Sequence, residues 1–444
     1  MELESGLPFK FYFENKDSYN RILPNNLSKE ELEEYNQLAN ENYNWDTHLQ
    51  NRKTNKLINS FFNWIRDNNL ISENIEDDNL IYLCEAFTPV SFYEDELVKN
   101  MSSDVYDAIK NNKMRILFNW FAEPLYDEHF NQFIQNLCEK YKLDITNFYV
   151  LTSANNIKNT SNINYISDHF FLKTSAEFLK YYLQNKIFKP NSFDYVCEIV
   201  NQDIFQSKKE NHFLCLNRSV DRPHRYAFGL FLEKYNLWNK GIFSFLVCDN
   251  HKQNDALIEV FNQSTAEEYS KYRIPFHSKM PLEIDTKFLI NNNRLNDFGT
   301  SNIYYKPIYE KTAINIVTET TFKKNTVFIS EKTFHPIINL QPFIMFASNG
   351  QLQELRNLGF KTFGHVIDES YDDEEDNYIR FKKVCNEILR LSEMSIDEIN
   401  QLFLSCKDIC IYNRNHLLSF TKYDVFENSL QQIKKIWNSK EKQF

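Results

Sequence analysis

The chain has 444 residues, 42% of them hydrophobic and 16% aromatic, enough to bury the cores of about two domains of ordinary size. Its formal net charge of −11 excludes the long-range attraction to duplex DNA that a basic surface provides. With only seven glycines and neither G-x-G-x-x-G nor G-x-x-x-x-G-K-[ST], a phosphate site must rely on side chains and helix ends.

Eight cysteines occur without a C-x-x-C pair, which is typical of reduced thiols in a cytoplasmic protein. The N-terminus lacks the basic and apolar regions of a signal peptide, and no apolar run approaches the ~18 residues of a membrane span. We therefore expect no membrane span. Cys406 and Cys410 lie one helical turn apart, and core packing is the favoured interpretation because two ligands do not close a zinc site.

The first half alternates short apolar runs with helical patterns. Strands are predicted at 80–87, 115–121 and 148–151, with a helix at 129–141. This alternation is typical of βαβ units around a parallel sheet. The polar stretch 202–211 is predicted to be a linker, which gives an N-terminal domain at 1–205 and a C-terminal domain at 206–444.

The second half begins a new α/β set. Its predicted strands lie at 212–217, 242–248, 314–318, 327–329 and 343–347. Helices are predicted at 223–235, after Ser330, and at 351–358, where Gly359 is the cap. Pro336 would lie inside the helix after Ser330, so that helix either has an irregular first turn or starts later. A final helix is indicated by apolar residues at Phe426, Leu430, Ile433 and Trp437.

Two clusters carry candidate chemistry. Arg218, Arg222 and Arg225 follow a strand and cross the start of a helix, where guanidiniums suit a diphosphate. The alternative is a solvated turn with surface Arg–Asp pairs, and His224 is either a further donor or structural. Asp221 is the expected N-cap of this helix.

The other cluster joins the end of one strand to the start of the next helix. It comprises Glu319, Thr320, Ser330, Glu331, Lys332 and Thr333. Glu331 either stabilises the helix start or accepts hydrogen bonds from a ribose diol. Lys332 would face phosphates as a point charge.

The segments VFISEKTFHPIINLQPFIMFASNGQLQELRNLGFKTF and LNRSVDRPHR resemble a family of glycosyltransferase-like proteins of phages, giant viruses and bacteria. They are also similar to α-1,3-fucosyltransferases, in which a Glu-containing strand precedes a Thr-Glu-Lys helix opening. The resemblance covers roughly residues 212–375 and only faintly the first 200. It implies a GT-B fold: two Rossmann-like domains facing a cleft, with the donor nucleotide on the C-terminal one.

The resemblance also implies roles for individual residues. Glu331 would bind ribose, while Lys332 and one or more of the three arginines would neutralise a leaving nucleotide diphosphate without a metal or other cofactor. The nucleotide-sugar site would also include Glu319, Thr320, Ser330 and Thr333. Glu123, in NWFAEPL, is similar to the proposed base of fucosyltransferases, although Pro124 follows it directly where Ser-Pro is expected. Glu85 is a second candidate for the base.

The leading hypothesis is an inverting, metal-independent transferase that uses a nucleotide-diphosphate sugar. One alternative is a binding or assembly protein that keeps the scaffold without the chemistry. Another is transfer to modified DNA bases, which the net charge disfavours.

The acidic stretch 368–376 is either a metal site or, as the favoured interpretation, a solvated loop or helix start. The donor, the acceptor (glycan, protein, lipid or nucleic acid) and the oligomeric state stay open, and a viral source would place the protein in the host cytoplasm.

Overall fold

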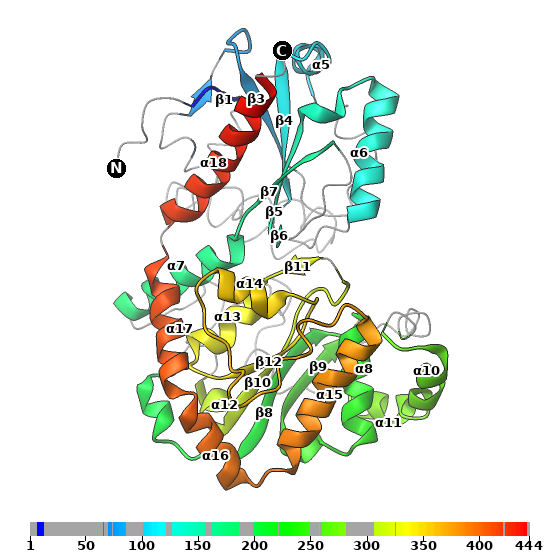
Figure 1. Cartoon of the computed structure of the whole chain (residues 1–444), viewed down its shortest axis with the longest axis vertical. Helices are drawn as coiled ribbons and strands as arrows, with labels where there is room; N and C mark the ends of the chain where they lie inside the picture. The colour runs from blue at the N-terminus through cyan, green and yellow to red at the C-terminus, as the bar shows by residue number, and fades with distance from the viewer. Residues whose placement is uncertain are drawn as a thin grey trace, which may run out of the picture. The chain divides into compact units, whose positions relative to one another are not determined.

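The computed structural model describes residues 7–12, 65, 70–72, 74–85, 101–120, 127–155, 162–185, 199–220, 222–247, 257, 260–280, 306–324, 326–420 and 422–441. The chain divides into two compact units (Figure 1). Unit 1 comprises residues 1–153, 157–168 and 423–444, and unit 2 comprises residues 154–156 and 169–422. Each contains a parallel sheet with helices, so the predicted α/β class with two Rossmann-like domains is confirmed.

The described residues of unit 1 form a six-stranded sheet in the order β2-β1-β3-β4-β5-β7, and every neighbouring pair is parallel. Its strands are β1 (Lys10–Tyr12), β2 (Ile71–Ser72), β3 (Leu80–Glu85), β4 (Met114–Trp120), β5 (Phe148–Thr152) and β7 (Asn164–Ser167). Its helices are α5 (Ser103–Lys110), α6 (Asp127–Tyr141) and, from Tyr423 onward, α18 (Lys422–Glu441), with the 3-10 turn η2 (Ile145–Asn147). The predicted strands β3, β4 and β5 and the predicted helix α6 are confirmed.

The last helix packs against unit 1 through Phe9 and Arg115. Leu430, Ile433 and Trp437 are buried, which confirms the predicted apolar stripe for these three positions, whereas the side chain of Phe426 lies outside the described residues. The Trp437 ring lies 5.2 Å from that of Phe9, and the Arg115 guanidinium lies 3.4 Å from its centroid. The C-terminal end of the chain therefore completes the core of the unit that the N-terminal strands begin.

In unit 2, the residues that the structure describes form a four-stranded parallel sheet in the order β12-β10-β8-β9. Its strands are β8 (Asn211–Ser219), β9 (Gly241–Val247), β10 (Thr312–Thr318) and β12 (Phe343–Phe346), while β6 (Ala154–Asn155) and β11 (Val327–Phe328) form an antiparallel pair. The helices are α7 (Phe170–Asn185), α8 (Pro223–Lys234), α10 (Gln263–Ser270), α11 (Arg273–Ser278), α12 (Lys306–Lys311), α13 (Glu331–Ile338), α14 (Gln351–Asn357), α15 (Asn377–Glu393), α16 (Ile396–Ser405) and α17 (Lys407–Ser419), with the 3-10 turns η3 (Gln202–Phe205) and η4 (Trp238–Lys240). All the strands predicted in the second half are present within a few residues of their expected ends.

The strand order reverses at β8. The chain runs from β8 to β9 on one side, and β10 and β12 then add on the other side. In open α/β sheets, ligands bind outside the carboxyl ends of the strands at such a reversal. In unit 2 this point lies between the ends of β8 and β10, where both candidate clusters are located.

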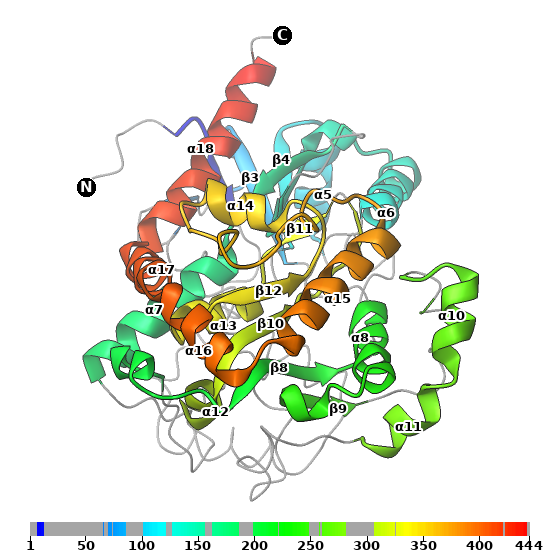
Figure 2. The same cartoon turned by 60° about the horizontal axis from the view of Figure 1, so that its bottom comes forward.

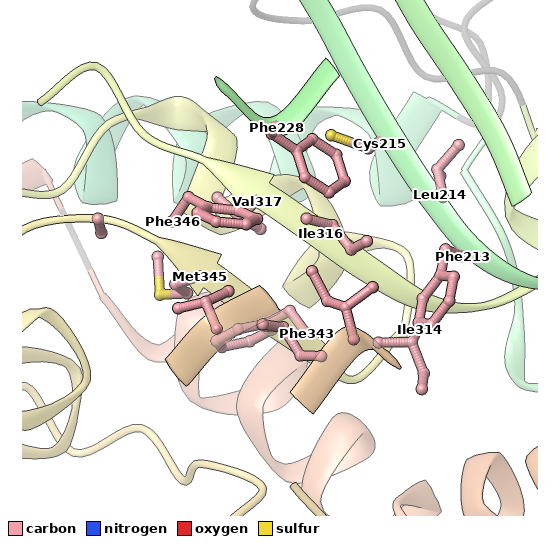
Figure 3. Packing of buried hydrophobic residues seen from close by; sticks show 14 of the residues in the cluster. Phe213, Leu214, Cys215, Phe228, Ile314, Ile316, Val317, Phe343, Met345 and Phe346 are labelled. Atoms are coloured by element: carbon pink, nitrogen blue, oxygen red, sulfur yellow. The ribbon is translucent and has the colours of Figure 1, made fainter. Parts of the chain in front are cut away.

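Aromatic packing fixes the helices α8 and α15 to one face of this sheet. The ring of Phe346 in β12 lies 4.9 Å from Phe228 of α8 and 5.2 Å from Phe381 of α15. Figure 2 shows these two helices next to each other, and Figure 3 shows Phe228 close to Phe346 in the core. Each buried aromatic side chain stabilises the unit by roughly 2–3 kcal/mol. These contacts therefore stabilise the packing of α8 against the sheet.

The segment predicted to be a linker is instead a packed part of unit 2. Ile204 and Phe205 are buried, and the Phe205 ring stacks 5.2 Å from that of Phe403 in α16. Helix α7 also packs with α13 and α17 of this unit. The change between units after residue 168 therefore differs from the predicted boundary at 205, because the described residues of 170–185 and 199–205 bury apolar side chains in the C-terminal core.

Lys209 lies inside this packed segment with only 1% of its surface exposed. Its Nζ donates to the carbonyl oxygens of Glu310 (3.0 Å) and Tyr309 (3.4 Å) at the end of α12, and it lies 4.2 Å from the Phe403 ring centroid. Burial lowers the pKa of Lys209 to about 7, partly offset by Glu310.

This depressed pKa predicts a pH-dependent stability. Between pH 7 and the unfolded pKa of Lys209 the unfolded chain binds more protons, so the free energy of unfolding rises with pH. We expect wild type to gain about 2 kcal/mol relative to Lys209→Met between pH 7 and pH 9. Denaturant unfolding of both proteins at the two pH values measures the difference, and parallel pH profiles would contradict the expectation.

Candidate functional site

A single buried carboxylate organises the end of β10. Glu319 is fully buried and follows the last residue of that strand. Its Oε1 accepts from the Ser330 amide (3.2 Å) and the Thr333 hydroxyl (2.5 Å), and its Oε2 accepts from the Ser330 hydroxyl (2.5 Å) and the Thr320 amide (3.1 Å). An ionised carboxylate offers roughly four lone-pair sites, so this acceptor is saturated by the protein itself.

The same contacts shape the opening of α13. Ser330 is the N-cap, and its hydroxyl accepts from the Lys332 amide at 3.3 Å. The Thr333 amide donates to the Ser330 carbonyl, a bond of 3-10 type in the first turn. The helix thus starts at Glu331 with an irregular first turn, which is the first of the two alternatives that Pro336 left open.

The opening of α8 is attached to the same point from the other side. The N-cap is Arg222, so Pro223 is the first helical residue, and the expected cap Asp221 lies outside the described residues. His224 Nε2 lies 2.8 Å from the carbonyl oxygen of Glu319, and Arg225 donates to the carbonyls of Thr318 and Glu319, both at 3.1 Å. A carbonyl only accepts, so His224 carries its proton on Nε2.

Charges from both helix openings act on Arg225. The pKa of Arg225 is lowered to about 10, first by burial and then by the charge of Arg222, while Glu319 and Glu331 partly offset the shift. His224 has a pKa well below its ordinary value because of burial and then of the charge of Arg225, so it is neutral at neutral pH. The opening of α8 and the opening of α13 therefore share one electrostatic environment.

Glu331 and Lys332 form the more accessible edge of this environment. Lys332 Nζ lies 2.6 Å from Glu331 Oε1 and 3.3 Å from Ser330 Oγ, and the two charged side chains are 27% and 15% exposed. Burial raises the pKa of the Glu331 carboxyl, but the charge and hydrogen bond of Lys332 outweigh it and leave that pKa below its usual value. Glu331 is consequently an ionised acceptor, suited to hydroxyl donors.

The remaining predicted residues take different positions. Arg218 belongs to β8, but its side chain lies outside the described residues, as does the whole of Glu123. Glu85 ends β3, and its side chain is likewise not described. Thr320 is half-buried, whereas Ser330 and Thr333 are buried with their hydroxyls directed to Glu319.

The acidic stretch 368–376 is used for helix caps and ion pairs. Asp372 accepts from the amides of Leu352 and Gln353 at the start of α14, and Asp376 caps α15. Glu369 accepts from the Phe363 amide and the Thr362 hydroxyl. In the described part of the chain, no group of three or more His, Cys, Asp or Glu residues could hold a metal ion.

Sequence reasoning did not single out Arg380, although it holds two strand ends in place. Its guanidinium is buried, donates to the carbonyls of Phe322 and Ala347, and stacks over the Phe322 ring. These carbonyls follow β10 and β12, so Arg380 fixes the loops at the carboxyl edge of the sheet. Arg380 lies on a helix 34 residues after Phe346, and no sequence pattern indicates that its side chain reaches the strand ends.

Similar solved structures include two trehalose-phosphate synthases. An α,α-trehalose 6-phosphate synthase from Burkholderia multivorans is 10% identical, with a TM-score of 0.35 over 89% of this chain and 83% of that chain. The UDP-forming α,α-trehalose-phosphate synthase from Burkholderia xenovorans, in complex with glucose-6-phosphate, is 12% identical, with a TM-score of 0.35 over 91% and 79%. At these values the likeness carries no argument about this chain.

The sequence matches no protein-family model and no curated protein. The α/β class therefore rests on the two parallel sheets themselves. Among the described residues, none of the helices combines the length and apolar character that crossing a membrane requires.

Proposed function

We propose that the chain is a GT-B-like glycosyltransferase that moves a sugar from a nucleotide-diphosphate sugar to an acceptor hydroxyl. The observation that carries the proposal is the meeting of two helix openings at the strand-order reversal, with Arg222 and Arg225 on one and Glu331 and Lys332 on the other. Glu331 can accept hydrogen bonds from a ribose diol, and the cations can donate to a diphosphate joined to it.

The contacts divide the donor between the two openings. The Ser330 and Lys332 amides at the start of α13 already donate to Glu319 and Ser330, so they are not available to phosphate, and the Lys332 ammonium is the group that this opening offers to the diphosphate. Glu331 would accept from the ribose diol. The diphosphate would lie against Arg222 and Lys332, with Arg218 as a further candidate from the end of β8.

In the proposed reaction, the bond between the anomeric carbon and the β-phosphate oxygen breaks, and its electron pair stays on the diphosphate. The acceptor oxygen forms the new bond from the opposite face, with inversion, and gives its proton to a base, for which Glu123 is the candidate and Glu85 the second. Fixed cations close to the diphosphate stabilise the charge that grows there in the transition state, which is the part that a metal plays elsewhere.

A titration of the full chain tests this proposal. UDP, GDP, ADP and CMP and their sugar derivatives are added in turn, with heat of binding and thermal unfolding as the measurements. We expect one nucleotide to bind and to stabilise the chain by about 2.7 kcal/mol at a hundredfold excess over its dissociation constant. Binding of a sugar nucleotide with neither transfer nor hydrolysis would favour a catalytically silent binding protein, and no binding by any of them would refute the donor site.

A further inference from the structure

We infer that Glu319 is a positioning residue that sets the distance between the ribose-binding and diphosphate-binding parts of the donor site. This inference rests on the proposed function and deepens it. Glu319 was expected to touch the donor, but it has no exposed surface and its carboxylate oxygens already accept four hydrogen bonds from the chain. Any effect on the donor must pass through the groups it holds.

The two ends of this residue hold different helices. Its carboxylate binds Ser330 and Thr333, the cap and first turn of α13, and thereby fixes the residues that lie between them, Glu331 and Lys332. Its carbonyl oxygen accepts from His224 and Arg225 in the first turn of α8, directly after Arg222. One buried residue thus joins the two openings.

This arrangement has a consequence for ligands of different length. A nucleoside diphosphate reaches both openings, so its affinity depends on the spacing between them. Inorganic pyrophosphate makes no ribose contact with Glu331 and needs only Arg222 and Lys332, whose long side chains adjust to a changed spacing between the openings. Loss of the nearby negative charge would favour pyrophosphate. A substitution at Glu319 should therefore change the affinities for the two ligands by different factors, whereas a general loss of stability would change both alike.

The test compares Glu319→Gln with wild type by calorimetric titration, well below the unfolding temperature of either. The amide keeps the size but presents a donor to groups that are themselves donors. For the tightest-binding nucleoside diphosphate we expect affinity to fall about tenfold, and for pyrophosphate to stay equal or rise up to about threefold. Weakening of both ligands by the same factor, or of neither, would overturn the positioning role.

Thr333→Val provides a second variant if Glu319→Gln does not fold. It removes one buried hydroxyl donor to Glu319 and keeps the shape of the side chain. We therefore expect the affinity for the nucleoside diphosphate to fall about threefold relative to that for pyrophosphate. If wild type binds neither pyrophosphate nor any nucleoside diphosphate, the proposed function fails, and the inference fails with it. If wild type binds both ligands and the two variants keep the wild-type ratio of affinities, only the inference fails.

Discussion

Lys332→Ala is expected to lower turnover by about 10²–10³-fold, measured as release of nucleotide diphosphate from the best-bound sugar nucleotide. Lys332 is half-buried and bonded to Glu331 and Ser330, so its ammonium is already held at the α13 opening before a donor binds. In a mechanism without a metal, this charge must stabilise the leaving diphosphate as the glycosidic bond breaks.

Lys324→Ala is the matched control for that variant. Lys324 is an exposed lysine in the connection between β10 and β11, a few residues before the same helix. Its removal changes the net charge by the same amount, and we expect turnover within twofold of wild type. Full turnover in Lys332→Ala, or an equal loss in both variants, would show that the position of Lys332 has no part in the reaction.

Arg225→Met is expected to lower the unfolding temperature of unit 2 by roughly 5–10 °C. The guanidinium of Arg225 is buried and donates to the carbonyls of Thr318 and Glu319 at the end of β10. Removing it leaves buried acceptors with fewer donors, at a cost of about 2–4 kcal/mol. Differential scanning calorimetry of the full chain measures the shift.

Arg222→Ala gives the contrast, three residues earlier on the same helix opening. Arg222 is only half-buried, and we expect its loss to change the unfolding temperature by no more than about 2 °C while weakening pyrophosphate binding about tenfold. The reverse pattern, with Arg222 needed for stability and Arg225 for the ligand, would exchange the roles assigned to the two arginines.

Ile314–Thr318 and Phe343–Phe346 could be predicted as strands because they are largely apolar and buried at every position. This pattern is typical of parallel strands that are covered on both faces of the sheet. By contrast, β1, β2 and β7 are two to four residues long and mixed in polarity, and only pairing with their neighbours makes them strands. No local pattern marks such segments.

The residues of the candidate site could be named from the sequence, but the role of each one could not. The residues around Glu331 are recognisable in the sequence because charged and hydroxyl side chains lie between two apolar runs. Whether each one faces a ligand or the protein depends on contacts across 11 to 95 positions, such as Ser330 with Glu319 and His224 with Glu319. The linker prediction failed for a related reason, since the buried Phe205 and Lys209 lie in a stretch that is polar on average.

The openings of α8 and α13 are proposed to hold the pyrophosphate and the ribose of a sugar donor together. A crystal structure of the full chain with the tightest-binding nucleoside diphosphate would show where both groups bind. We predict the diphosphate against Lys332 and Arg222, with the ribose diol donating to Glu331 and Glu319 still bonded to Ser330 and Thr333. A nucleotide bound elsewhere, with the Glu331–Lys332 pair untouched, would contradict the account.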